Sequence, residues 1–254
     1  MGIRVSGIFI DGLPKCKPTK NTQGLNIDYK KVNNLSPKNI SVAFYKKKTI
    51  ILYDDFMENI LTQDLDFSEF EKQILELFPN KTFFSIIIDD TINFTGFSIT
   101  VKNKKYRTKG TLQGNIYADE GTLVATESQI YKNFIKTIKD NKAVNNVIEK
   151  YRTSMDEETV RKTVLKLRDG LYEKSNSENE YHYLNGTMDN AVCEDFLDHY
   201  FKMDYFDIED KISFYQLNEK KFDLLKDFKG FISISYKNHI KKHWITSVIT
   251  KFKI

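Results

Sequence analysis

The chain has 254 residues, of which 40% are hydrophobic and 29% are charged, so a wholly disordered protein is excluded and one or two domains are expected. The formal net charge at pH 7 is only +4, from 39 basic and 35 acidic side chains, which disfavours a dedicated DNA-binding protein. The two cysteines, Cys16 and Cys193, are too few for a disulfide framework or a four-thiolate zinc site, and we expect both to be reduced thiols.

The first part of the chain is expected to be mostly β-structure. An apolar run closed by the turn pair Asp11-Gly12 is typical of a strand, and two later β-type runs that flank three lysines predict a hairpin. The expected elements are a strand at 3–10, a polar loop at 13–38 with one short element near 25–32, and a hairpin of residues 42–45 and 49–53.

Two helices are expected next. Residues 56–61 form a short helical run, and Asp66 with Glu69 has the spacing of a capping box for a second helix. Apolar residues then recur at helical intervals until Pro79, which ends the pattern. These apolar residues are Phe70, Ile74 and Leu77.

Three further strands follow this helix. Residues 82–88 are almost all apolar, which predicts a strand buried on both faces. Apolar and polar residues alternate over 97–101, which predicts a half-buried strand, and a polar turn leads from it into a third strand at 106–112.

The second half of the chain is expected to begin with helices and to end in a β-hairpin. Helix caps are expected at Thr126 and at Ser154, where Glu157 completes a capping box. The polar run 175–180 is the best linker candidate. The remaining elements are an amphipathic helix over 192–203 and a hairpin of residues 231–236 and 244–252, with 237–243 as its loop.

Because strands cluster instead of alternating with helices, we predict an α+β fold with a mixed or largely antiparallel sheet packed by several amphipathic helices. We treat residues 1–254 as one unit. A subdivision near 175–180 is an alternative, with a main α+β region at 1–174 and a C-terminal helix and β-hairpin at 181–254.

Three stretches resemble a bacterial family that is described only as a domain of unknown function. They are the opening strand that runs into Asp11-Gly12, residues 40–55 and residues 83–127, and the likeness extends to about residue 205. The resemblance supports the architecture and implies no activity, and Ala125-Thr126 replace the family's usual proline. The motif residues are Gly96-Phe97, Asn103-Lys104, Arg107, Asp119-Glu120-Gly121 and Glu127.

Carboxylates close three of the expected strands: Asp11, Asp54, Asp55, Asp89 and Asp90. With aligned strand ends they would converge and suit Mg²⁺, as in a phosphoryl-transfer enzyme or nuclease. We favour the simpler interpretation that each aspartate bonds to turn amides or caps a helix. We therefore expect no resident metal and no cofactor.

The histidines and cysteines suggest no site. His239 and His243 are four residues apart, but we expect them in a lysine-rich hairpin loop, where neighbouring positive charges disfavour a metal ion. Cys193 and His199 are six apart and so lie on opposite faces of one helix. Cys16, between two lysines, is interpreted as a surface thiol.

Basic and aromatic residues interleave in two predicted hairpins, where cations hold phosphates and rings stack on bases in a single-strand-binding module. The candidates are Lys104, Tyr106, Arg107, Lys241, His243 and Trp244. Solvated hairpins with inward aromatic rings are the simpler interpretation, so nucleic acid is a possible partner that we do not favour.

The function expected from the sequence is therefore that of a non-catalytic binding protein whose partner is another protein, because no catalytic signature is complete. The alternatives left open are the metal-dependent enzyme and the nucleic-acid module. No apolar window approaches the roughly 20 residues that a membrane span needs, so we expect a cytoplasmic protein.

Overall fold

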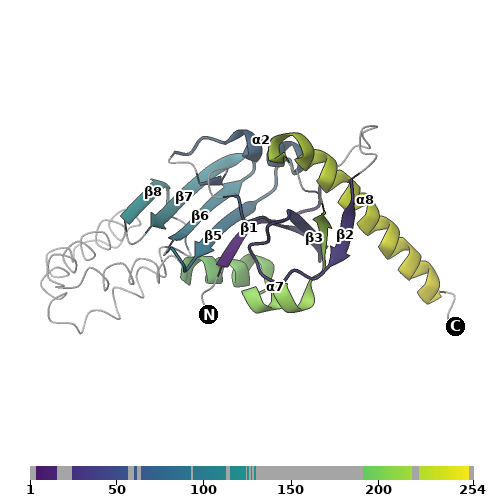
Figure 1. Ribbon diagram of the computed structural model, residues 1–254. Coiled ribbons are helices and arrows are strands. Elements are labelled where there is room, and N and C mark those ends of the chain that lie inside the picture. The colour runs from purple at the N-terminus through teal and green to yellow at the C-terminus, as the bar shows by residue number, and fades with distance from the viewer. Residues whose placement is uncertain are drawn as a thin grey trace, which may run out of the picture.

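Nine strands form one antiparallel sheet in the computed structural model (Figure 1). The structure describes residues 4–15, 25–56, 60–61, 64–92, 94–112, 115–123, 125, 127, 129, 191–218 and 223–251, without the side chains at 115, 199–200 and 243–251. The helix predicted after Ser154 and the linker at 175–180 lie outside these residues. So do residues 57–59 of the helix predicted at 56–61, and all but 127 and 129 of the helix predicted after Thr126.

The order across the sheet is β2-β9-β3-β4-β1-β5-β6-β7-β8, and every neighbouring pair is antiparallel. All the strands predicted in the first half of the chain are confirmed to within a few residues. The bounds are β1 Arg4–Ile10, β2 Ile27–Lys30, β3 Ser41–Tyr45, β4 Lys48–Leu52, β5 Phe83–Asp89, β6 Phe94–Val101, β7 Lys104–Leu112, β8 Asn115–Gly121 and β9 Phe214–Leu217.

Two tight turns account for the confirmed hairpins. Lys46 and Lys47 join β3 to β4, and both have positive φ angles, of 46° and 65°. Lys102 and Asn103 join β6 to β7 with φ angles of 48° and 65°. Two successive residues in this conformation match the right-handed twist of the paired strands, so the turns hold the register of both hairpins.

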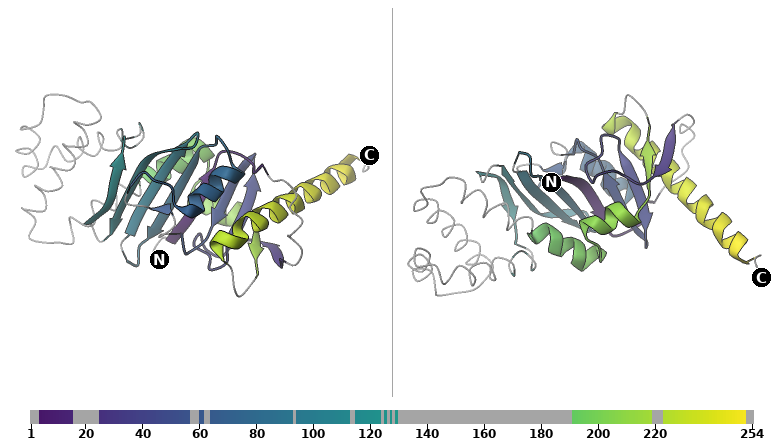
Figure 2. Two further views of the ribbon diagram at one scale, coloured as in Figure 1. Left: turned by 90° about the horizontal axis from the view of Figure 1, so that it is seen from above. Right: turned by 60° about the horizontal axis from the view of Figure 1, so that its bottom comes forward.

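Helices cover both faces of the sheet (Figure 2). One face carries α2 (Glu69–Leu77) and the first part of α8 (Leu224–Lys251), and the other carries the segment 191–212. That segment contains a helical stretch at 191–196, the π-helix η1 (Leu197–Phe201) and α7 (Tyr205–Lys211). None of the helices in the described part of the chain combines the length and apolar character needed to span a bilayer.

The central strands are buried on both faces. In β5, Phe84 and Ile86 contribute to the core under the segment 191–212, and Phe83 and Ile87 to the core under α2 and α8, as predicted. The half-buried strand predicted at 97–101 is wrong, because β6 is buried on both faces except at Val101. The chain before α2 covers its second face, where Leu61 lies directly over Gly96.

The cap of α2 lies two residues beyond its predicted position. Ser68, and not Asp66, is the N-cap: its Oγ accepts a hydrogen bond from the Glu71 amide at 3.1 Å, and Glu71 Oε2 accepts one from the Ser68 amide at 2.9 Å. Ser68 with Glu71 has the same three-residue spacing as Asp66 with Glu69, so the sequence alone offers two registers. The contacts of Asp66 and Glu71 decide between them.

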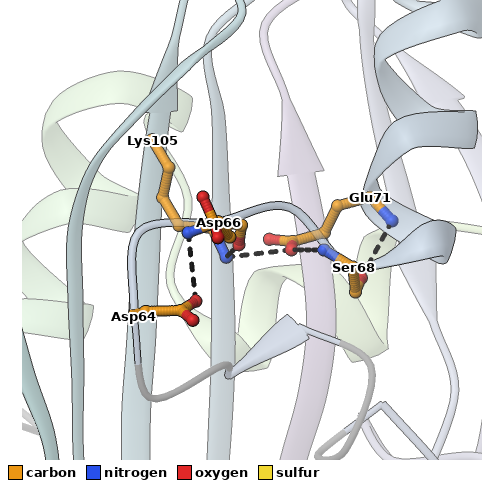
Figure 3. Close-up of polar contacts among 5 residues, drawn as sticks. All are labelled: Asp64, Asp66, Ser68, Glu71 and Lys105. Atoms are coloured by element: carbon orange, nitrogen blue, oxygen red, sulfur yellow. Dashed lines mark hydrogen bonds and ion pairs between the residues drawn. The ribbon is translucent and has the colours of Figure 1, made fainter.

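A lysine from β7 fixes that register (Figure 3). Lys105 Nζ donates to the Asp66 carbonyl and to Glu71 Oε2, each at 2.9 Å, and the Lys105 and Glu71 side chains are fully buried. Burial raises the pKa of the Glu71 carboxyl, and the Lys105 charge offsets part of that rise. The pair therefore holds the loop before α2 against the sheet.

The C-terminal β-hairpin predicted at 231–236 and 244–252 is wrong, because both segments belong to α8. The alternation over 231–236 is a short part of a helical pattern. Phe228, Phe231, Ile232 and Ser235 recur at intervals of three and four, and all four are fully buried on one face of the helix. Lys242 Nζ lies 3.5 Å above the Tyr29 ring where α8 passes edge strand β2.

The short strand β9 was not predicted. Its four residues pair with β2 on one side and β3 on the other, so the C-terminal part of the chain joins the main sheet. A run of four residues is too short to show a period, and its partner strands β2 and β3 lie roughly 170 to 190 residues earlier in the chain. Whether residues 1–254 form one unit that folds as a whole stays a prediction.

The predicted α+β fold packed by several amphipathic helices is wrong. In the described residues a large antiparallel sheet dominates and helices are few. The predicted helix at 192–203 ends early, because η1 closes at Lys202 in the left-handed conformation and Asp204 begins α7.

Candidate functional site

The strand-end aspartates do not meet at one edge of the sheet. Asp11 follows β1, which is antiparallel to its neighbours β4 and β5. The end of β1 therefore lies beside the starts of β4 and β5, and Asp11 is a strand length away from the residues that follow those two strands. There it forms an ion pair with Lys48, with Oδ1 and Nζ 2.9 Å apart. The structure therefore separates Asp11 from Asp54, Asp55, Asp89 and Asp90.

At the other end of these strands, Arg4 begins β1 and lies between the last residues of β4 and β5. Its Nε is 3.0 Å from Asp89 Oδ2, and Asp89 Oδ1 accepts hydrogen bonds from the amide and hydroxyl of Thr91. Burial tends to raise the pKa of Asp89, but the Thr91 hydrogen bonds and the Arg4 charge outweigh it, so the net pKa is lowered. At Asp54, burial and the neighbouring Asp55 raise the pKa, and Arg4 only partly offsets the rise.

An arginine between carboxylates is a poor arrangement for a divalent cation. In the parts of the chain that the structure describes, no three His, Cys, Asp or Glu side chains are placed to hold a metal ion together. The described residues therefore contain no set of metal ligands that would support a metal-dependent phosphoryl-transfer enzyme.

The first basic and aromatic hairpin is divided between surface and interior. Lys104 and Tyr106 are exposed, and Lys104 Nζ lies 5.0 Å from the centre of the Tyr106 ring. Arg107 is buried: its Nε and Nη2 bond to the two Glu127 carboxylate oxygens at 2.9 and 2.7 Å. Its Nη1 donates to the Glu120 carbonyl at 3.0 Å, so this side chain supports the fold and cannot reach a phosphate.

The buried Arg107 also gathers motif residues on which the family resemblance rests. Asp119 Oδ1 lies 2.7 Å from Nη2, close enough for an ion pair although the angle is not that of a hydrogen bond. Gly121 ends β8 with a φ of +93°, and a Cβ there would meet the Tyr106 carbonyl oxygen at 2.0 Å. The contacts of Arg107 therefore hold β8 and Glu127 against β7 at the end of the sheet.

The second predicted hairpin does not exist, because Lys241, His243 and Trp244 all lie in α8. Lys241 is exposed, whereas the side chains of His243 and Trp244 are outside the described part of the structure. His239 was predicted in a solvated loop, but it lies half-buried on α8, with its ring 5.2 Å from that of Phe44.

Among the described residues, a groove of about 1030 Å³ lies beside Arg4. Its walls come from the start of β1, the turn at 33–35 and the segment 191–209. The Ser6 amide holds that turn in place by donating to the Leu35 carbonyl at 2.9 Å. Six carboxylates line this acidic groove: Glu194, Asp195, Asp198, Asp204, Asp207 and Glu209.

Most of this negative charge has no neutralising partner among the residues that the structure describes. Of these residues, two with cationic side chains, Arg4 and Lys202, line the groove with the six carboxylates. Asp204 caps α7 by accepting a hydrogen bond from the Asp207 amide at 2.7 Å, and Asp207 forms an ion pair with Lys211. The other four carboxylates have no cationic partner among the described residues, so the groove attracts positive charge although the chain as a whole is weakly basic.

An irregular backbone places these carboxylates around one groove. The π-helix η1 carries Asp198, and Lys202 then turns the chain with a φ of 54° before α7 begins. Single π-helical turns occur frequently at functional sites. The sharp turn brings acidic residues of two successive helices to the same opening.

Tyr205 supplies a second, independent sign of a binding site. Its side chain lines the groove and is only 8% exposed, and its hydroxyl has no hydrogen-bond partner among the described residues. Burial, with Cys193 and Glu194 nearby, raises the pKa of Tyr205 well above its ordinary value. Leaving a buried polar group without a partner costs about 1–3 kcal/mol. The hydroxyl itself has almost no accessible surface, so a ligand in the groove would remove this cost only by drawing the hydroxyl out towards it.

The groove also has an aromatic rim. Phe206 follows Tyr205 in α7 and is 73% exposed, the largest exposure among the large hydrophobic side chains described. Carboxylates, an aromatic ring and a hydroxyl together are groups that recognise an ammonium or guanidinium ion.

None of the groove residues was proposed as a site from the sequence. The signal that could have found them is charge density, because Glu194 to Asp210 contains seven carboxylates. It was overlooked because the same stretch fits an amphipathic helix, whose exposed face is ordinarily charged.

No family model matches this chain, and no curated protein or solved structure was found to be similar to it. The resemblance to the bacterial family therefore stays a prediction.

Proposed function

We propose that this chain is a non-catalytic binding protein that takes a cationic segment of a protein partner into the acidic groove. The observation that carries the proposal is a groove of about 1030 Å³ in which four carboxylates have no cationic partner among the described residues. Tyr205, whose hydroxyl has no partner in the same part of the chain, and the exposed Phe206 also line this groove.

Lysine and arginine side chains are the protein groups that fit this chemistry. An ammonium ion donates up to three hydrogen bonds, which suits carboxylates and a tyrosine hydroxyl, and a cation also contacts an aromatic face favourably. We place the protein in the cytoplasm, where a buried reduced thiol such as Cys193 is ordinary.

The test is a titration of the full chain into fluorescein-labelled hexalysine, followed by fluorescence anisotropy. We expect saturable binding that weakens at least about tenfold when ionic strength rises from about 0.05 M to about 0.5 M, since salt screens exposed charges. The variant D195K/D198K reverses two exposed carboxylates of the groove and should abolish binding.

The matched control is E76K/E120K, which reverses the same number of exposed carboxylates elsewhere on the chain. Binding lost in both variants would show only a non-specific response to net charge. Hexalysine binding that survives D195K/D198K would remove the acidic groove from consideration.

A further inference from the structure

We infer that the chain self-associates head to tail, with the C-terminal part of α8 from one copy seated in the acidic groove of another. This inference rests on the proposed function, because it names the occupant of the same groove. The part concerned is residues 237–251 of α8, called the arm below.

The arm is a continuation of α8 that passes the edge of the sheet. His239 still contacts Phe44 and Lys242 lies over the Tyr29 ring, and beyond them the helix projects away from the sheet. Among the helix residues whose side chains the structure describes, up to Lys242, Ser235 is the last that is fully buried. Beyond it Lys237, Ile240 and Lys241 are exposed, Ile240 by 52%. Figures 1 and 2 show the helix running on past β2 with no other element of the described chain beside its C-terminal end. The exposed face of this helix, with Lys237, Ile240 and Lys241, is therefore accessible to another molecule.

The exposed face of the arm combines positive charge with apolar surface. Lys237 and Lys241 are one helical turn apart and fall on the side opposite to Phe228 and Ser235, which are buried against the sheet. Neither lysine has a salt bridge with the described residues. A basic and apolar helix face is complementary to a groove that is lined by carboxylates and has an exposed phenylalanine at its rim.

The dimensions are also compatible. A helix with its side chains is about 10–12 Å across, so a groove of about 1030 Å³ accommodates roughly two turns of it. The arm extends over fifteen residues, about four turns, and can therefore fill the groove while part of it spans the distance between two copies.

The contact has to form between copies. All three views place the C-terminal end of α8 far from α7, and the first half of the helix is fixed on the sheet by its buried residues. An arm on one surface and a groove on another make a heterologous contact, which produces open chains or closed rings.

The test is sedimentation velocity of the full chain over a range of concentrations, at low and high salt. We expect the weight-average mass to increase with concentration at low salt and to fall towards the monomer at high salt. The arm variant K237E/K241E and the groove variant D195K/D198K should each be monomeric. The control K15E/K104E, with two exposed lysines reversed elsewhere, should behave as the unmodified chain.

Mixing the two monomeric variants gives the decisive result. The unchanged arm of the groove variant meets the unchanged groove of the arm variant, so a 1:1 complex should form although neither variant associates alone. A chain that stays monomeric at all concentrations, or association that depends on the arm but not on the groove, would overturn the inference. Hexalysine binding by a strictly monomeric chain would leave the proposed function standing and remove only this occupant.

Discussion

At the scale of single residues, the acidic groove contains one side chain that is poorly placed for stability. The hydroxyl of Tyr205 is buried without a partner among the described residues, whereas phenylalanine would fill the same space without a polar atom to desolvate. We expect Y205F to raise the free energy of unfolding by about 1 kcal/mol in urea denaturation. The same variant should bind hexalysine more weakly, because it has no hydroxyl that can turn out of the core towards a bound cation.

Tyr215 provides the matched control for this prediction. Its hydroxyl is also buried without a partner among the described residues, but it lies on the α8 side of the sheet, and burial raises its pKa to about 12. Y215F should therefore be stabilising and leave hexalysine binding unchanged. A loss of stability in Y205F, or equal effects of both variants on binding, would contradict a ligand-directed role for Tyr205.

Asp89 makes the stability of the chain sensitive to acid. Because its pKa in the folded state is below its usual 3.8, the ionised carboxylate stabilises the fold fully above that value. The contribution is lost as the pH falls through the folded pKa. The difference in unfolding free energy between the unmodified chain and D89N should thus be constant near neutrality and should shrink below about pH 4.

This pH dependence is measured by urea denaturation at a series of pH values. T91V removes the hydroxyl that donates to Asp89 but keeps the carboxylate and the backbone hydrogen bond, so it should retain part of the acid sensitivity. A difference between the unmodified chain and D89N that stays the same down to pH 2 would show that the Arg4 and Thr91 contacts contribute nothing.

At the scale of elements, the parts that the sequence predicts correctly are those whose signal is local. The hairpin turns at Lys46-Lys47 and Lys102-Asn103, and the apolar strand β5, depend on residues next to one another in the chain. The end of α8 was misread because six alternating residues satisfy a strand and a helix equally well. The buried Phe228, which lies before that window, decides for the helix when it is taken together with Phe231, Ile232 and Ser235.

Elements defined by distant contacts could not be predicted in the same way. Strand β9 is recognised by its pairing with β2 and β3, which no local pattern encodes. The acidic groove is likewise assembled from three separate segments. The aspartates do follow the strands that the sequence predicts. Whether they lie close together depends on the directions of those strands, and the antiparallel pairing of β1 puts Asp11 at the opposite end of the strands from the other four.

At the scale of the whole molecule, the pairing of β9 connects the two ends of the chain. Gln216 of β9 pairs with Asp28 of β2 on one side and with Ser41 of β3 on the other. Strand β9 therefore lies between β2 and β3, and it is the one partner strand of β2 among the described residues. The segment 191–212 also packs against one face of the sheet, with the Phe196 ring stacked on the Phe84 ring at a centroid distance of 4.0 Å. A division of the chain near 175–180 would therefore separate strands and core residues that lie in contact.

We expect that neither residues 1–174 nor residues 181–254 fold alone. The first fragment lacks β9, α8 and the segment 191–212, so the apolar side chains on both faces of its sheet would be exposed to water. Expressed separately, each fragment should unfold without a cooperative transition in urea and should bind a hydrophobic dye, while the two mixed together should regain a cooperative transition. A cooperative transition in the first fragment alone would show that the sheet is complete without β9 and that the chain has two domains.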